Sequence, residues 1–362
     1  MAISSGRAAQ QLVGAGAALP LAGGSLAFSA CEAITRYPSG PARRVLLSLH
    51  ALRVWANAEG KPVRAQLDEA LDRLSKPRPP IGALSFDRPR LMGVINVTPD
   101  SFYDGGRYAD PRAAIARGRE LVAQGADLID VGGESTRPGA TPVSEQEERT
   151  RVIPVIEALV AAGATVSIDT RHATIMREAV AAGASVLNDV GALAGEESLA
   201  TAARLKVPVV LMHGTADPRK ATDPRTMQKD PRYDDVVLEV YAYLEERVSR
   251  CEAAGIPRER LILDPGIGFA KTPAHNAALL EAVALFHGLG CALLLGVSRK
   301  SFIARFSGGE GPDLRLPGSL AAAQWCASQG MQILRVHDVA ETRQALAVAT
   351  TAADPRLLPA TA

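Results

Sequence analysis

Carboxylates and amides follow a series of short apolar runs along this chain of 362 residues. Continuous Val/Ile/Leu runs of this length are typical of strands that are buried on both faces. The polar residues at their ends are Asn96, Asp130, Asp169, Asn188 with Asp189, His213, Asp264, Ser298 and His337. Acids that converge on one site repel each other unless a cation or a donor-rich ligand lies among them. A flat heterocycle with an amidine-like edge fits such a site, because one carboxylate accepts two parallel hydrogen bonds from that edge.

Each of these residues also has a purely structural alternative. An Asp or Asn after a strand commonly caps the helix that follows, and for any one position alone this alternative is favoured. The repetition at successive strand ends favours a shared ligand site. Met212 and Phe269 lie at strand ends, where their side chains either cover a bound ring or simply pack in the core.

Basic residues in three segments predict an anion site beside the acids. The loop Gly132–Gly139 offers a hydroxyl, a guanidinium and exposed amides. Residues Ser298–Ser301 open a predicted helix, whose N-terminal amides favour an anion. Arg335 and His337 lie two residues apart on the last run and therefore face the same side. A single basic residue is usually a solvated surface charge, but the three segments together favour phosphate or pyrophosphate.

The sequence is less informative about metals and nucleophiles. It contains no HExxH motif and no cysteine quartet, so a structural zinc site is not expected. Asn96, Asp100 and Asp104 could offer oxygen atoms to Mg²⁺ that is shared with substrate phosphates. A side-chain nucleophile is not expected, because there is no GxSxG motif and no cysteine beside a base.

The spacing of the runs predicts the fold that positions these residues. Stretches with helical spacing separate most of them, and the pattern covers about 260 residues, the size of a (β/α)8 TIM barrel. In this fold the active site lies at the C-terminal ends of the strands, where this chain places its polar residues. The predicted helices include 144–162, which opens with a capping box, 172–182 and 236–254. The polar loops 97–110 and 132–143 are expected to close over the site.

The first part of the chain does not join this pattern. We predict an N-terminal extension of unknown role, loosely or partly ordered, over residues 1–86, the barrel over 87–352 and a short C-terminal tail over 353–362. Within the extension, Leu49–Trp55 is interpreted as a strand and Ala65–Leu74 as a helix.

Composition excludes several classes of protein. The chain is 47% hydrophobic and 22% charged, which is ordinary for a globular domain. The net charge of +1 leaves no broad basic field for nucleic acid or for a membrane surface. No apolar run approaches the length of a transmembrane span. The four cysteines have no disulfide-like spacing, so we expect a reducing, cytoplasmic location.

Taken together, the motifs resemble those of the dihydropteroate synthase family. They follow the family's order over roughly residues 88–350, and NVTPDSF and GGESTRPG are its most specific signatures. The matching segments are Asn96–Phe102 (NVTPDSF), Asp130–Gly139 (DVGGESTRPG), Ser167–Arg171 (SIDTR), Asn188 with Asp189, Asp264–Phe269 (DPGIGF), Ser298–Phe302 (SRKSF) and Arg335–Val339 (RVHDV). The resemblance implies that 7,8-dihydropterin-6-ylmethyl diphosphate is joined to 4-aminobenzoate, giving 7,8-dihydropteroate and pyrophosphate. It also implies Mg²⁺ as the cofactor and a homodimer as the usual assembly.

The resemblance further implies a role for each site residue. The pterin ring would be held by Asp169, Asn188, Met212, Asp264 and Lys300. The diphosphate would be bound by Asn96, Thr136, Arg137, Arg335 and His337, with Asn96 also a metal ligand. The 4-aminobenzoate would be bordered by Pro138, Phe269 and Ser301. The residues expected to act directly in catalysis are Asp169, Lys300, Arg335 and His337.

The expected chemistry accounts for the missing nucleophile. Carbon–oxygen cleavage leaves pyrophosphate, so cations must meet the charge that grows on the leaving group. The electron-rich ring spreads the positive charge on its methylene carbon, which a carboxylate such as Asp169 would stabilise. A neutral arylamine then attacks that carbon, and no side chain has to be activated.

This chain departs from the family pattern at two places. Ala270 stands where the family commonly has glycine, and the loop Gly214–Thr226 is longer than usual.

Two alternative functions also remain to be distinguished. A pterin-binding methyltransferase that feeds a corrinoid protein shares the barrel, but it has no leaving diphosphate and would give Arg335 no purpose. A non-catalytic or altered-specificity paralogue would bind a pterin or a partner without condensation; the intact loops after the first two strands argue against it.

Overall fold

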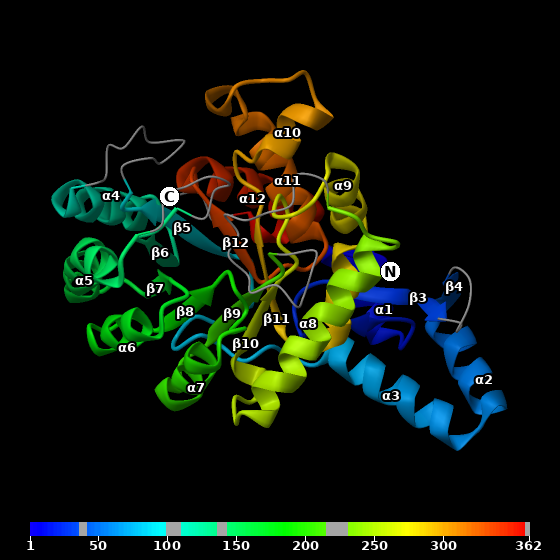
Figure 1. The fold of residues 1–362 in the computed structure, drawn as a ribbon. Coiled ribbons are helices and arrows are strands. Elements are labelled where there is room, and N and C mark those ends of the chain that lie inside the picture. Colours follow the sequence, from blue (N-terminus) through cyan, green and yellow to red (C-terminus); the bar gives the residue numbers. More distant parts are fainter. Residues whose placement is uncertain (36–41, 99–109, 136–142, 215–230, 359–362) are drawn as a thin grey trace.

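The chain folds around a closed barrel of eight parallel strands (Figure 1), which confirms the predicted (β/α)8 architecture. The computed structural model describes residues 1–35, 42–98, 110–135, 143–214 and 231–358. Each strand pairs with its sequence neighbours, and the last strand closes the ring on the first. The strands are β5 (Arg90–Asn96), β6 (Leu128–Gly132), β7 (Val166–Asp169), β8 (Val186–Asp189), β9 (Val209–Met212), β10 (Leu261–Asp264), β11 (Ala292–Gly296) and β12 (Ile333–Val336).

Helices surround the barrel, as Figure 1 shows. They are α4 (Pro111–Ala123), α5 (Glu145–Ala161), α6 (Ala173–Ala181), α7 (Glu196–Leu205), α8 (Val236–Ala253), α9 (Pro273–Glu281), α10 (Ser301–Phe306), α11 (Leu316–Ser328) and α12 (Val339–Ala353). The prediction of a capped helix at 144–162 is confirmed in α5, where the Ser144 hydroxyl accepts a hydrogen bond from the Glu147 amide at 3.2 Å. Within the described ranges, no helix has both the length and the apolar character needed to cross a membrane.

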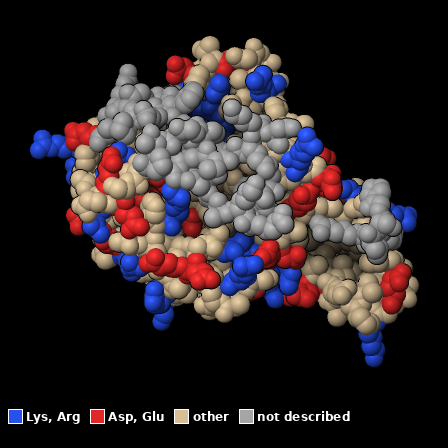
Figure 2. Space-filling model, in the orientation of Figure 1, with Lys and Arg blue, Asp and Glu red and all other residues tan. Residues whose placement is uncertain are grey.

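Successive side chains of each strand point to opposite sides, and this alternation divides the core into two parts. Residues such as Ile95, Ile129 and Leu187 point outward and pack against the helices in one large cluster. Met92 and Leu128, on the same strands, belong to a second cluster inside the barrel. Because every second residue faces inward, the parity of a residue decides whether it reaches the interior. On the face drawn in Figure 2, positive and negative side chains are interspersed outside the grey region, as the net charge near zero predicts.

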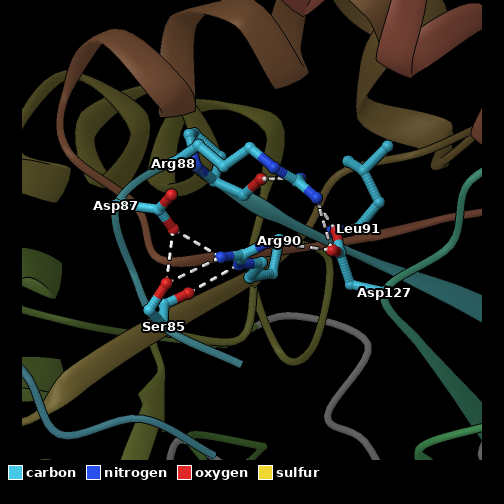
Figure 3. Close-up of polar contacts among 7 residues, drawn as sticks. Ser85, Asp87, Arg88, Arg90, Leu91 and Asp127 are labelled. Atoms are coloured by element: carbon cyan, nitrogen blue, oxygen red, sulfur yellow. Dashed lines mark hydrogen bonds and ion pairs between the residues drawn. The ribbon is translucent and has the colours of Figure 1, made fainter. Parts of the chain in front are cut away.

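An ion-pair network lies at the N-terminal end of the barrel, away from the predicted site (Figure 3). The Asp127 carboxylate, just before β6, accepts hydrogen bonds from Arg88 at 2.6 Å, from Arg90 at 3.1 Å and from the Leu91 amide at 2.9 Å. Nearby, the buried side chain of Ile81 packs against the interior cluster of the barrel. This end is therefore closed by packing and ion pairs, and its role is structural.

The N-terminal extension has a hydrophobic core of its own. Its elements are β1 (Ala2–Ser4), α1 (Gly6–Gly14), β2 (Leu19–Pro20), β3 (Ala27–Thr35), β4 (Arg43–Ser48), α2 (Leu49–Glu59) and α3 (Lys61–Ser75), and its strands form one antiparallel sheet. The predicted helix at 65–74 is confirmed within α3, but the predicted strand at Leu49–Trp55 is wrong. That segment begins α2, because the Ser48 side chain caps it and Leu49, Leu52 and Ala56 form one buried helical face.

Polar contacts that join the extension to the barrel include those of Arg78 and Arg44. The guanidinium of Arg78 is buried and donates to the carbonyl oxygens of Arg73 at 2.7 Å and His287 at 3.1 Å. On β4, Arg44 lies 2.7 Å from the Asp235 carboxylate, which caps the start of α8. The extension is thus in contact with the barrel both at its linker and at α8.

We expect Asp127→Ala to lower the free energy of unfolding by about 3 kcal/mol, because it removes the largely buried acid and leaves the guanidinium of Arg90 with the exposed Asp87 as its remaining acid partner among the described residues. Urea unfolding measures the loss, and ligand binding at the opposite end of the barrel should not change. Asp87→Ala is the matched control, since it removes the exposed acid partner of the same Arg90 and should cost less than about 1 kcal/mol. Equal losses in the two variants would contradict this interpretation.

Candidate active site

Strand register brings the predicted residues to one end of the barrel. Asn96, Gly132, Asp169 and Asn188 are register neighbours on the consecutive strands β5 to β8. Along its own strand, or across the register to a neighbouring strand, each of these residues lies an even number of positions from a residue of the interior cluster. Since side chains of a strand alternate between its two sides, these positions face the inside of the barrel. Across the ring, Met212 pairs with Asp264 and Gly296 with Arg335. Residues predicted for the ring and for the diphosphate therefore meet at one end of the barrel.

A fully buried carboxylate joins the two groups. Asp130 has no exposed area, and its Oδ2 accepts hydrogen bonds from Asn188 Nδ2 at 2.9 Å and from Arg335 Nε at 2.7 Å. Arg335 Nη2 in turn donates to Asp169 Oδ2 at 3.1 Å. The sequence identified Asp130 as an acid at a strand end but gave it no separate role. Its inward parity was a usable signal, whereas its partners lie 58 and 205 residues away and could not be identified.

The surroundings of Asp169 affect its protonation. Burial, and then the charge of Asp130, raise the pKa of Asp169 to about 8, although Arg335 opposes the shift. Burial acts to lower the pKa of Arg335, but the charges of Asp130 and Asp169 raise it above its ordinary value. Arg335 is therefore a permanent cation, and near neutral pH Asp169 can hold a proton or release it.

Lys300 lies between the ring residues and Arg335. A methyl group on Gly296 would lie 3.7 Å from Lys300 Nζ and 3.8 Å from Arg335 Cβ, so these two cationic side chains flank the same point of β11. Lys300 Nζ donates to the Ile267 carbonyl and lies 4.5 Å from the centre of the Phe269 ring. Burial lowers the pKa of Lys300 to about 8, and the charge of Asp264 acts in the opposite direction. Lys300 is thus poised to lose or keep its charge within the working pH range.

The loops after β11 and β12 are tied to each other. His337 Nδ1 lies 3.1 Å from Ser298 Oγ, and Arg299 forms a bidentate ion pair with Asp338. Burial and the charge of Arg335 lower the pKa of His337 to about 3, so its imidazole is neutral at physiological pH. A neutral His337 can donate a hydrogen bond but carries no charge, whereas Arg335 beside it is positively charged.

Asp189 has a structural role: its carboxylate stabilises the backbone that follows the strand. It lies next to Asn188 and has the opposite parity, so its carboxylate points out of the barrel interior. The two oxygens accept hydrogen bonds from the amides of Gly191 at 2.7 Å and Leu193 at 3.0 Å. Burial raises its pKa to about 6. Asp189 stabilises the turn after β8, whereas Asn188 belongs to the site.

Some predicted residues lie outside the described part of the chain. These are Thr136, Arg137, Pro138, Asp100, Asp104 and nearly all of the loop Gly214–Thr226. Ser301 is described, and it begins α10 as predicted, with an exposed side chain. Among the described residues, no three His, Cys, Asp or Glu side chains are arranged to hold a metal ion. The structure therefore brings together Asn96 and the ring residues with Arg335 and His337, whereas the residues predicted on the loop after β6 lie outside its described part.

Comparison with known proteins identifies relatives over the barrel. The model of a family described as pterin binding enzyme matches residues 92–337. The dihydropteroate synthase of Escherichia coli (strain K12) is 46% identical over 267 residues, which are 74% of this chain and 92% of that protein. The enzyme of that name from Neisseria meningitidis serogroup B (strain ATCC BAA-335 / MC58) is 44% identical over 271 residues, 73% of this chain and 93% of that protein.

Solved structures agree with these relatives. The Xanthomonas albilineans dihydropteroate synthase with 4-aminobenzoic acid has a TM-score of 0.68 and 49% identity, covering 74% of this chain and 94% of that one. The same enzyme in complex with 7,8-dihydropteroate has a TM-score of 0.65 and 44% identity, with the same two coverages. In both, the similarity spans nearly the whole of the relative.

We expect Asp130→Asn to weaken the binding of both a hydroxymethylpterin and pyrophosphate by at least tenfold each, because one oxygen holds Asn188 and Arg335 together. Isothermal calorimetry with the two ligands measures the losses. Asp189→Asn is the control: it should destabilise the turn after β8 and leave both affinities unchanged. A loss confined to one ligand would contradict the joint role.

The raised pKa of Asp169 predicts a pH dependence of stability. A carboxyl whose pKa is higher in the folded than in the unfolded state stabilises the fold at low pH, and this contribution is lost as pH rises towards 8. Asp169→Asn should therefore unfold at higher urea concentration than the wild type at pH 9, with a difference that shrinks towards pH 5. A difference that does not change with pH would show that Asp169 is ionised throughout.

Proposed function

This chain belongs to the dihydropteroate synthase family of pterin-binding enzymes, and we propose that it joins a 7,8-dihydropterin-6-ylmethyl diphosphate to 4-aminobenzoate. The products are 7,8-dihydropteroate and pyrophosphate. The observation that carries the proposal is the chain of contacts from Asn188 through Asp130 to Arg335. It supports a substrate with a heterocycle at one end and an anionic leaving group at the other, bound across the end of the barrel.

The geometry supports a division of labour in the reaction. The carbon–oxygen bond breaks with its electron pair remaining on pyrophosphate, and Arg335 faces the charge that grows there. Asp169 lies beside Arg335 and, when ionised, stabilises the positive methylene carbon. The amine nitrogen then forms the new carbon–nitrogen bond and loses a proton. His337 contributes a neutral hydrogen bond to the leaving group.

Ring recognition would use the deeper residues. Asn188 and Asp264 are inward-facing and buried, and they offer an amide and a carboxylate to the polar edge of a pterin. Asp264 already accepts a hydrogen bond from the Gly266 amide at 2.7 Å, which fixes the orientation of its carboxylate. Met212 is buried next to it in register and would pack against the ring face. Phe269 and Ser301 would border 4-aminobenzoate, together with Pro138.

Mg²⁺ is part of this proposal. The Asn96 side-chain oxygen and Asp169 Cβ would lie 3.7 and 3.4 Å from a methyl group on Gly132, which places an amide oxygen near Asp169, the carboxylate that accepts a hydrogen bond from Arg335. One or two protein oxygens together with substrate phosphates are a usual set of ligands for this ion. Asn96 would thus hold Mg²⁺, which would neutralise charge on the leaving pyrophosphate.

The methyltransferase alternative is less well supported. A methyltransferase has no leaving diphosphate. It would leave Arg335, which two carboxylates hold in place beside the ring residues, without an anion to bind. A paralogue that binds without condensation would keep these contacts and fail to release pyrophosphate. Pyrophosphate release from a pterin diphosphate that depends on 4-aminobenzoate therefore separates the proposal from both alternatives.

We also propose a cytoplasmic homodimer. The four cysteines are buried and free, which suits a reducing compartment. The large apolar side chains Phe306, Leu314 and Trp325 are exposed on the successive segments α10, η4 (Pro312–Leu314) and α11, which supports a protein partner on this side of the barrel. Sedimentation velocity measures the assembly, and a single species of 38.0 kDa would contradict the dimer.

We expect Arg335→Ala to weaken binding of the pterin diphosphate at least a hundredfold and binding of the bare hydroxymethylpterin by less than tenfold. The reason is that Arg335 supplies charge to the leaving group, whereas the ring is held by other residues. Calorimetry with both ligands measures the split, and Arg305→Ala, which removes an exposed arginine of α10, is the control. Equal losses for the two ligands would place the diphosphate elsewhere.

A further inference from the structure

A Lys–His pair lies beside the site, and no step of the proposed reaction uses it. Lys271 Nζ lies 2.9 Å from His213 Nδ1, 2.9 Å from the Phe269 carbonyl and 3.3 Å from the His213 carbonyl. These three acceptors match the three N–H donors of one ammonium group. The donors of Lys271 therefore face the protein, and the side chain connects backbone segments.

The segments it connects are the end of β9 and the loop after β10. His213 directly follows Met212, and Phe269 lies five residues after Asp264. The two backbones touch, because a methyl group on Gly266 would lie 2.0 Å from the His213 carbonyl oxygen and 3.4 Å from Lys271 Nζ. Only glycine fits at this crossing, and Lys271 closes it from one side.

The imidazole is suited to accept from an ammonium. His213 is 3% exposed, and burial together with the charge of Lys271 holds its pKa well below the ordinary value. A neutral ring can accept at Nδ1 with its proton on Nε2. The ring packs edge-on against Tyr243, with 4.9 Å between the ring centres. His213 is thus a fixed acceptor in the core.

A second contact holds the same loop. The Tyr233 hydroxyl donates to the Ala270 carbonyl at 3.0 Å, next to the carbonyl that Lys271 holds. Ala270 has φ +46°, in the left-handed region that is unfavourable for a non-glycine residue. The loop adopts a backbone conformation that it does not favour by itself, and Lys271 and Tyr233 stabilise it from outside.

The position of this loop matters for the second substrate. The Phe269 ring, assigned to the 4-aminobenzoate border, lies beneath Lys300 Nζ at 4.5 Å from its centre. Lys300 also donates to the Ile267 carbonyl of the same loop. A displacement of the Phe269 carbonyl would therefore move the ring that borders 4-aminobenzoate.

We propose that Lys271 is a positioning residue for 4-aminobenzoate: its side-chain nitrogen donates to the carbonyls of His213 and Phe269 and thereby places the Phe269 ring against that substrate. The proposal rests on the proposed function, since it names the second substrate of the same site. Lys271 does not touch the reacting atoms, and its effect is on affinity for 4-aminobenzoate rather than on the pterin or its diphosphate.

The test compares Lys271→Met, which keeps the aliphatic stem and removes every donor, with the wild type in steady-state pyrophosphate release. We expect the KM for 4-aminobenzoate to rise at least tenfold, while the KM for the pterin diphosphate changes less than twofold. Tyr233→Phe should raise the same KM by a smaller factor, about threefold. Lys206→Met is the control: it removes an exposed lysine and should change neither KM.

The wild-type measurement separates this proposal from the proposed function. A wild type that releases no pyrophosphate refutes the function, whatever Lys271 does. With an active wild type, equal rises in both KM values, or an unchanged KM for 4-aminobenzoate, overturn the positioning role. If Lys271→Met does not fold, Lys271→Gln replaces it; the amide keeps a donor for the Phe269 carbonyl, so the KM for 4-aminobenzoate should rise less than tenfold but more than twofold, and no rise overturns the proposal.

Discussion

The buried carboxylate of Asp130 is the constraint on which the site depends. A charge without exposed area has to be compensated inside the protein, and here one oxygen does so with Arg335 and Asn188. The other oxygen has no hydrogen-bond partner within the described part of the chain. Arg335 is held by this carboxylate and by Asp169, so its guanidinium is oriented before any ligand arrives. The ring and diphosphate regions are therefore connected through one carboxylate.

The barrel makes this arrangement possible by simple alternation. Inward residues on successive strands are apolar near the N-terminal end and polar near the C-terminal end, as Met92 and Asn96 show on β5. The apolar layer excludes water below the charges, which is why burial shifts the pKa values of Asp169 and Lys300 towards neutrality. The loops then add contacts that the strands cannot, such as the pair of Arg299 and Asp338.

The sequence predicted the barrel and its strand ends because both depend on short-range periodicity. The different positions of the Asn188 and Asp189 side chains also follow from strand alternation. Neighbouring residues point to opposite sides, so Asn188 faces the barrel interior and Asp189 faces the turn after β8. The role of Asp130 did not follow, since its partners are far away in the chain. The segment Leu49–Trp55 was wrongly predicted as a strand because an apolar run of this length fits either structure, and the Ser48 cap decided for a helix. Lys271 directly follows Ala270 in a segment that the sequence analysis considered, but no role was assigned to it, because its partners are mostly backbone carbonyls.

The contacts of the N-terminal extension have a consequence for how this barrel could be exchanged with others. The relatives match this chain over 92 to 94% of their own length but over only about three quarters of its residues, so most of the extension has no counterpart in them. In this chain, residues of the extension contact the barrel: Arg78 donates to the carbonyl oxygen of His287, and Arg44 pairs with the carboxylate of Asp235, which caps α8. A barrel cut free at the linker would lose both partners at once. In this chain the stability of the barrel therefore depends in part on contacts that the barrel alone would not supply.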